Sequence, residues 1–152
     1  MWYNDSMKDY IEKLENSKAV NEVKFMNVIS LAFIGDSLYS AFVRTHVLNK
    51  LEEKSKGLHS ATSAYVKAKA QAAVYLQLEK AGYFCEEELG IAKRARNCKL
   101  NHTAKNASFE DYRLATMFES VLGYVFYTKD TERLIDMMMR AIEISDHEKV
   151  GK

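Results

Sequence analysis

The sequence predicts an all-α fold. Its 152 residues contain no proline, whereas average usage would supply about seven or eight. Proline disrupts helix interiors, and the chain also has only six glycines, so long helices can run without interruption. No long run of alternating β-branched residues indicates a strand. The length suits one domain with a substantial core, and we expect a helical bundle.

Local signals place the first three helices. Ser6 begins a capping box that opens a short helix over about residues 6–16. A long helix is expected over about 22–49 and an alanine-rich helix over about 58–81. Gly82 then stands where a helix C-terminus favours glycine. The predicted buried face of the long helix consists of Val28, Leu31, Ala32, Gly35, Leu38, Tyr39 and Phe42.

Three further helices are expected in the second half of the chain. A helix over about 86–96 begins with three acids, which favour a helix N-terminus. Asparagines recur over 97–107, which predicts a loop. Ser108 opens the next helix with a second capping box, and Asp130 or Thr131 caps the last one. The last helix has apolar residues at helical spacing, namely Leu134, Ile135, Met138, Met139 and Ile142.

Two stretches, 31–43 and 114–126, are apolar on nearly all sides but carry one carboxylate each, Asp36 and Glu119. A helix with no polar face is typical of a protein interior. An ionised carboxylate placed there costs several kcal/mol unless a cation or hydrogen-bond donors meet it. The two acids could therefore meet across a packed pair of helices and hold a metal ion.

Small residues lie beside both acids. Gly35 precedes the first acid, and Gly123 follows the second by one turn. A glycine inside a helix costs about 1 kcal/mol relative to alanine, so its presence indicates the close approach of another group. Two facing carboxylates suit Mg²⁺, which keeps several waters and takes one or two protein carboxylates. The alternative is that arginine satisfies each acid, and Arg44 and Arg113 are near in sequence.

The net charge of +1 conceals an uneven distribution. Residues 54–78 and 91–109 contain no acid but several lysines and arginines. Locally basic segments are what binding to a phosphate backbone requires, although a solvated basic face has the same composition.

The remaining features indicate the cytoplasm. Cys85 and Cys98 show no zinc-ligand spacing and suit a reducing compartment. We expect no signal peptide, because the N-terminus has no basic region followed by an apolar stretch. The longest apolar run is too short to cross a bilayer.

Two motifs resemble the ribonuclease III family. Residues 31–38 resemble the family signature, and residues 116–123 resemble its second acidic motif. Further strings are similar to Mini-ribonuclease III, the short bacterial form with a catalytic domain alone: Leu58-His59, residues 66–72, residues 93–99 and Tyr112-Arg113. The set in this order is specific, and the resemblance covers about residues 22–144.

The chain departs from the wider family at three positions. Ile29, Ala32 and Thr116 stand where that family has carboxylates. The resemblance therefore assigns catalysis and metal binding to Asp36 and Glu119 only. With fewer protein ligands, water fills the remaining positions, and the number of metal ions, one or two, stays open.

The resemblance implies Mg²⁺-dependent hydrolysis of double-stranded RNA to 5′-phosphate ends, with Mn²⁺ as a substitute ion. It also implies a cytoplasmic homodimer that cuts both strands and matures the paired ends of the 23S ribosomal RNA precursor. Whether a ribosomal protein assists is left open. Duplex RNA is recognised mainly through phosphates and 2′-hydroxyls. The side chains expected to contact it are His59, Lys67, Lys69, Lys93, Arg94, Arg96, Asn97, Lys99 and Lys105.

The expected organisation is an N-terminal extension with a short helix (1–21), a ribonuclease III-like catalytic domain (22–145) and a polar tail (146–152). This leaves no room for a double-stranded-RNA-binding domain. Two alternatives remain: a non-cleaving RNA-binding module with the same fold, and a helical interaction domain whose two acids form salt bridges. The presence of both Asp36 and Glu119 argues against the first, and the joint set of motifs argues against the second.

Overall fold

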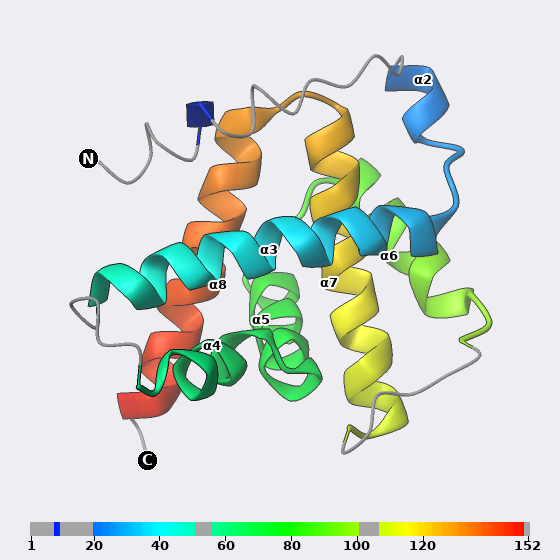
Figure 1. Ribbon diagram of the computed structural model, residues 1–152. Coiled ribbons are helices and arrows are strands. Elements are labelled where there is room, and N and C mark those ends of the chain that lie inside the picture. Colours follow the sequence, from blue (N-terminus) through cyan, green and yellow to red (C-terminus); the bar gives the residue numbers. More distant parts are fainter. Residues whose placement is uncertain (1–7, 10–19, 51–55, 101–106, 151–152) are drawn as a thin grey trace.

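The computed structural model describes residues 8–9, 20–50, 56–100 and 107–150, and within these ranges all regular structure is helical (Figure 1). The all-α prediction is therefore confirmed. The helices are α2 (Val20–Val23), α3 (Val28–Lys50), α4 (Leu58–Val66), α5 (Ala68–Lys80), α6 (Glu86–Asn97), α7 (Phe109–Tyr127) and α8 (Thr131–Val150).

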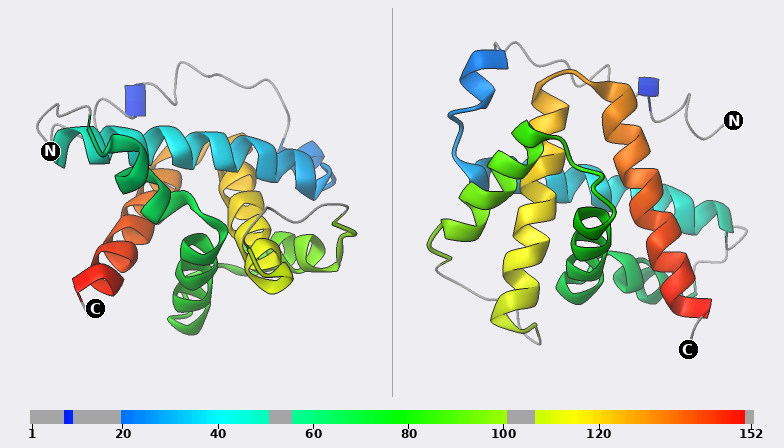
Figure 2. Two further views of the ribbon diagram at one scale, coloured as in Figure 1. Left: turned by 60° about the horizontal axis from the view of Figure 1, so that its bottom comes forward. Right: turned by 180° about the vertical axis from the view of Figure 1, so that it is seen from behind.

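Helix α7 is the centre of the domain. It packs against α3, α5, α6 and α8, and it runs between α5 and α6 in both the front and the back views (Figures 1 and 2). Helix α3 crosses it, and the rings of Tyr39 and Phe118 meet edge to face there with centroids 5.4 Å apart. Nearly every residue over 114–126 is buried, as predicted, because helices cover α7 on several sides.

The helix predicted over 22–49 is two helices in the structure. Helix α2 ends at Val23, and α3 begins at Val28. The Asn27 side chain causes the new start, because its Oδ1 accepts from the backbone N–H of Ile29 at 2.8 Å. Asparagine at this position offers the helix a cap, and the single-helix prediction is wrong here.

The helix predicted over 58–81 is also divided. Lys67 adopts an extended backbone, with φ −62° and ψ 150°, between α4 and α5. Its N–H donates to the carbonyl of Ser63, while its own carbonyl accepts from the N–H groups of Ala70 and Gln71. Lys67 therefore ends one helix and begins the next without a glycine or proline to signal the break.

Other predicted helix ends are confirmed. Gly82 has φ +64° after α5, and the N–H of Tyr83 closes the turn on the carbonyl of Leu78 at 3.0 Å. Ser108 Oγ accepts from the Asp111 N–H at the start of α7. Asp130 caps α8 by accepting from the N–H of residue 133 at 3.0 Å.

One face of α3 is exposed, contrary to the prediction that residues 31–43 are buried on all sides. The predicted buried face is confirmed, since all seven of its residues are buried. However, Ile29 is 39% exposed and Phe33 is 74% exposed. Asp36 is exposed as well, so it does not lie on the inward face. Within the ranges that the structure describes, this face of α3 is left uncovered.

A buried ion pair, absent from the sequence predictions, joins α6 to α8. Arg133 Nη2 lies 2.7 Å from Glu88 Oε2, and the Glu88 side chain is only 4% exposed. The same guanidinium donates to the carbonyl of Tyr83 and lies over the Tyr83 ring. This network fixes the connection between α5 and α6 against the last helix.

Some predictions fall outside the described residues. The helix expected over 6–16 is described only at residues 8–9, which are helical. The loop expected over 97–107 begins after Asn97, and residues 101–106 are outside the described part. Helix α8 continues to Val150, into the segment assigned to the polar tail. Within the ranges that the structure describes, no helix has both the length and the hydropathy needed to cross a membrane.

Candidate active site

Two glycines bring α3 and α7 into backbone contact. A Cβ atom on Gly35 would lie 1.9 Å from the carbonyl oxygen of Glu119, and one on Gly123 would lie 2.0 Å from the carbonyl oxygen of Leu31. No side chain fits at either position, so the helices cross at a distance that only glycine permits. The predicted close approach is confirmed, and it places the two acids side by side.

The carboxyl groups of Asp36 and Glu119 lie close enough at this crossing to shift one another's pKa. Asp36 is exposed, while Glu119 is half-buried. Neither acid forms an ion pair with any residue that the structure describes, and the Arg113 guanidinium instead lies 4.6 Å from the centre of the Phe109 ring. The salt-bridged alternative therefore has no support at this crossing.

Burial raises the pKa of Glu119 to about 8, and the adjacent charge of Asp36 adds to the rise. The pKa of Asp36 is also raised, because the helix crossing desolvates its carboxyl group, with a smaller opposing effect from Arg44. Near neutral pH the metal-free pair therefore keeps one proton between two carboxylates. A cation between them would replace that proton, so the pair fits a divalent metal ion in its charge and in its oxygen donors.

The protein supplies few ligands for such an ion. Within the described ranges, no group of three or more His, Cys, Asp or Glu side chains could hold a metal. At the positions where the wider family has carboxylates, Thr116 donates to the carbonyl of Tyr112 at 2.8 Å, Ala32 is buried and Ile29 is partly exposed. A site with two carboxylates and several waters suits Mg²⁺.

Gln71 is part of this site, although sequence reasoning gave it no role. Its Nε2 donates to Glu119 Oε1 at 3.0 Å and to the carbonyl of Val66 at 2.8 Å. Gln71 is only 2% exposed. The signal was available, because an amide stands on the helical face that otherwise carries Ala72, Val74 and Leu78.

The predicted RNA-contacting residues lie on both sides of α7. Lys67 and Lys69 are exposed at the start of α5, close in sequence to Gln71. His59 is exposed on α4. The exposed residues on or just after α6 are Lys93, Arg94, Arg96, Asn97 and Lys99. Lys105 lies outside the described residues. The structure thus places basic side chains on α5 and α6, the two helices that flank α7.

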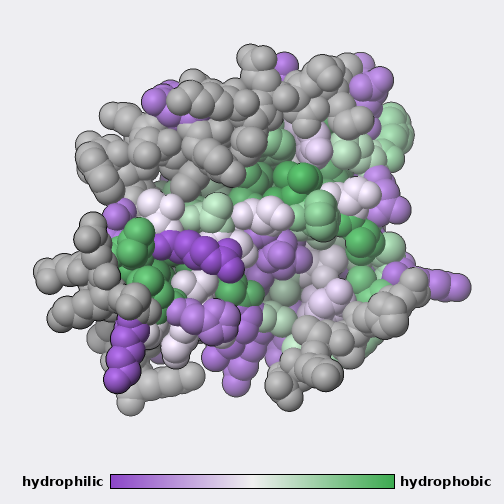
Figure 3. All heavy atoms as spheres, viewed as in Figure 1, coloured by the Kyte–Doolittle hydropathy of each residue, from purple (hydrophilic) through white to green (hydrophobic). Residues whose placement is uncertain are grey.

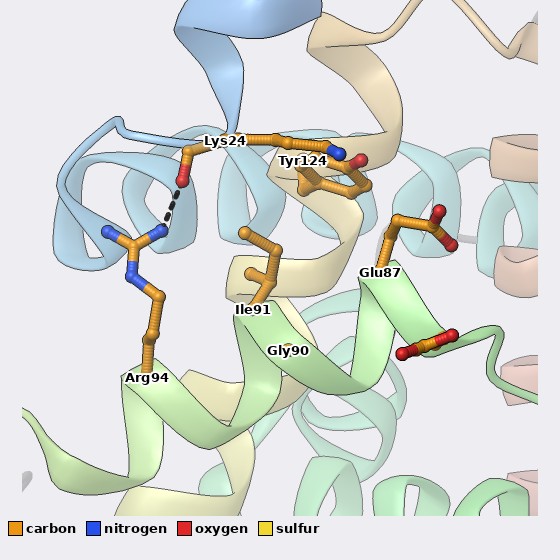
Figure 4. Close-up of a pocket in the computed structure, with 7 residues that line it drawn as sticks. Lys24, Glu87, Gly90, Ile91, Arg94 and Tyr124 are labelled. Atoms are coloured by element: carbon orange, nitrogen blue, oxygen red, sulfur yellow. Dashed lines mark hydrogen bonds between the residues drawn. The ribbon is translucent and has the colours of Figure 1, made fainter.

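Arg94 is already engaged by the fold. Its guanidinium donates to the carbonyl oxygen of Lys24 (Figure 4) and to that of Met26, just before α3. It borders a hollow of about 420 Å³ that includes neither Asp36 nor Glu119. The hollow is lined by Lys24, Glu86, Glu87, Gly90, Ile91, Arg94 and Tyr124. Because the Arg94 guanidinium binds two backbone carbonyls, it holds the chain in place ahead of α3.

The fold and the site together define a class of protein: an all-α domain in which two acids meet where two helices cross. A ribonuclease III domain matches residues 29–130 of the chain. The chain is 42% identical over 124 residues to the Mini-ribonuclease 3 of Clostridium tetani, with 81% of each chain covered. It is 39% identical over 135 residues to the Mini-ribonuclease 3 of Brevibacillus brevis, with 89% and 99% covered.

A crystal structure of a Fusobacterium nucleatum protein has a similar fold. Its TM-score is 0.68 at 26% identity, and the match covers 77% of this chain and 92% of that one. The chain therefore belongs to the ribonuclease III family and groups with its Mini-ribonuclease 3 members. The predicted endoribonuclease is confirmed. The family acts on double-stranded RNA and generally depends on a divalent metal.

Proposed function

We propose that this endoribonuclease hydrolyses double-stranded RNA with Mg²⁺ held between Asp36 and Glu119, and that Mn²⁺ can replace it. The observation that carries the proposal is the backbone contact of α3 and α7, which brings these two carboxyl groups together without an ion-paired cation among the described residues. When bound, the ion would supply charge neutralisation at the phosphate and activation of water.

The chain's own residues have distinct tasks in this proposal. Asp36 is exposed and would face the RNA. Glu119 is half-buried and accepts a hydrogen bond from Gln71. Lys67 and Lys69 are exposed at the start of α5, the helix that carries Gln71. Their positive charges would hold phosphates of the duplex near the acids.

The remaining contacts would come from α4 and α6. We assign to the duplex backbone the exposed side chains of His59, Lys93, Arg96, Asn97 and Lys99, together with Lys105 in the segment outside the described residues. The Arg96 guanidinium also forms an ion pair with the Glu110 carboxylate, with Nη2 and Oε1 3.4 Å apart. Arg94 is assigned to the fold instead, because two backbone carbonyls occupy its guanidinium.

We propose a homodimer that uses the exposed face of α3. On this face Ile29 and Phe33 are 39% and 74% exposed, and Phe25, in the turn before α3, is 85% exposed. Figure 3 shows apolar side chains interspersed with polar ones along α3, which runs across the front of the molecule in this view. A second copy would cover this face. Two catalytic centres in one dimer would match the two strands of a duplex.

The proposed substrate is the 23S ribosomal RNA precursor, whose paired ends the enzyme would mature in the cytoplasm. This assignment rests on the similarity to Mini-ribonuclease 3 proteins. The catalytic domain would span residues 22–145, after an N-terminal extension over residues 1–21.

The test is cleavage of a long perfect RNA duplex by the purified chain, with Mg²⁺ or with chelator, beside the single strands. We expect Mg²⁺-dependent cutting of the duplex and at least about a 1000-fold loss in Asp36→Asn, because one ligand of the ion is removed. Glu143→Gln, an exposed acid on α8, is the matched control and should cut normally. Salt-sensitive binding without cutting would instead indicate a non-catalytic RNA-binding module.

A further inference from the structure

We propose that Gln71 is the positioning residue of the metal site: its amide holds one oxygen of Glu119 and so presents the other oxygen to the ion. The inference rests on the proposed function, since it concerns the same site. Gln71 does not touch the reacting atoms in this proposal and acts through Glu119.

The break between α4 and α5 places Gln71 where it can do this. Helix α4 ends at Val66, so the carbonyl of that residue has lost its helical partner. Helix α5 begins again after the extended Lys67, and Gln71 lies one turn into it. From there Nε2 reaches both the Val66 carbonyl at 2.8 Å and Glu119 Oε1 at 3.0 Å. Both amide hydrogens of Gln71 are therefore used.

The second bond determines which end of the amide faces Glu119. An amide with one partner could turn its oxygen toward the carboxylate instead of its nitrogen. Because the Val66 carbonyl can only accept, it holds the nitrogen in place. The nitrogen then binds Oε1 of Glu119 as a fixed donor, and the other carboxylate oxygen is left for Asp36 or for an ion.

Stability alone does not explain a glutamine at this position. Gln71 is 2% exposed on an apolar helix face, and burying an amide costs free energy unless all its polar atoms are bonded. Its Oε1 has no hydrogen-bond partner among the residues that the structure describes. A methionine or leucine would fill the same volume without that cost. The donor toward Glu119 is what glutamine adds.

The test compares Gln71→Met with a matched control, Gln77→Met. Gln77 lies on the same helix, is exposed and donates to Glu148, away from the acids. Mn²⁺ binding to the full chain is measured by titration calorimetry, and folding is checked by circular dichroism. We expect Gln71→Met to bind Mn²⁺ about 10- to 100-fold more weakly than the wild type. Gln77→Met should bind it normally, and Gln71→Asn, whose shorter side chain cannot span both partners, should be weakened like Gln71→Met.

A folded Gln71→Met or Gln71→Asn variant with wild-type Mn²⁺ affinity would overturn the inference while leaving the proposed function intact. If the wild type itself binds no Mn²⁺, the proposed metal site fails as well. Should neither variant fold, the side-chain NH₂ signals of Gln71 in the wild type decide the question by NMR. They should shift on addition of Mg²⁺, and unchanged signals at saturating Mg²⁺ would overturn the inference.

Discussion

The carboxyl group of Glu119 is half-buried and faces a second acid, and both conditions favour its protonated form. Sequence alone could bring Asp36 and Glu119 together, because the glycine beside each acid indicated a close helix crossing. The one sequence signal for Gln71, an amide on an otherwise apolar helix face, does not show what the amide contacts. Its role arises only from the break in the chain at Lys67 and from the packing of α5 on α7.

The raised pKa of Glu119 predicts how the stability of the metal-free protein depends on pH. Between its ordinary value of 4.5 and about 8, the folded protein keeps a proton that the unfolded chain has lost. The free energy of unfolding should therefore fall as the pH rises through this window. Glu119→Gln removes the titrating group, so we expect it to be about 3 kcal/mol more stable than the wild type at pH 8 in chelator.

Urea denaturation at pH 5 and pH 8 measures this difference. Glu143→Gln should keep the pH dependence of the wild type, because the residue is exposed. Parallel losses of stability in the wild type and Glu119→Gln between the two pH values would show that Glu119 has an ordinary acidity.

At the scale of helices, the site depends on the crossing of α3 and α7. The ends of α5, α7 and α8 were predictable, because Gly82, Ser108 and Asp130 act locally. The breaks at Asn27 and Lys67 were not. An asparagine inside a helical pattern is common, and Lys67 ends α4 with an extended backbone that neither glycine nor proline signals.

Gly35→Ala should disrupt this crossing. The added methyl group would lie 1.9 Å from a backbone oxygen of α7, which cannot move aside as a flexible side chain could. We expect a loss of about 3 kcal/mol in the free energy of unfolding and weaker metal binding, because the helices must separate. Urea denaturation and Mn²⁺ titration measure the two effects.

Gly90→Ala is the matched control for the helical glycine. Gly90 lies in α6, and a Cβ atom there meets nothing within 4 Å. Alanine should stabilise this position by up to about 1 kcal/mol. If Gly35→Ala behaved in the same way as Gly90→Ala, the close contact between α3 and α7 would not exist.

At the scale of the whole molecule, the exposed face of α3 and the basic helices beside α7 define two different surfaces. Composition predicted the fold class correctly because proline-free sequences of this kind favour helices. It could not show that part of α3 is exposed, since a helix buried in a core and a helix buried between subunits have the same apolar pattern. Ile29 and Phe33 therefore needed the structure to be recognised as surface residues.

The proposed dimer predicts that Phe33→Lys yields a monomer. A lysine in the middle of a buried apolar contact leaves a charge without a partner, so the association should weaken by at least about 100-fold. Sedimentation or light scattering measures the mass, and Leu89→Lys, an exposed leucine on α6 (41% exposed), is the control. Equal masses for the wild type and Phe33→Lys would exclude this face as the subunit contact.

The most direct test of the central claim, that Asp36 and Glu119 jointly hold a divalent cation, is the number of protons released on binding Mg²⁺. Calorimetric titrations at pH 7 in buffers of different ionisation enthalpy give this number. The pKa of about 8 for Glu119 predicts the release of about one proton per ion by the wild type, because the carboxylate must ionise to bind. Glu119→Gln should release none and bind weakly. Binding by the wild type without proton release, or equal binding by Glu119→Gln, would contradict the account.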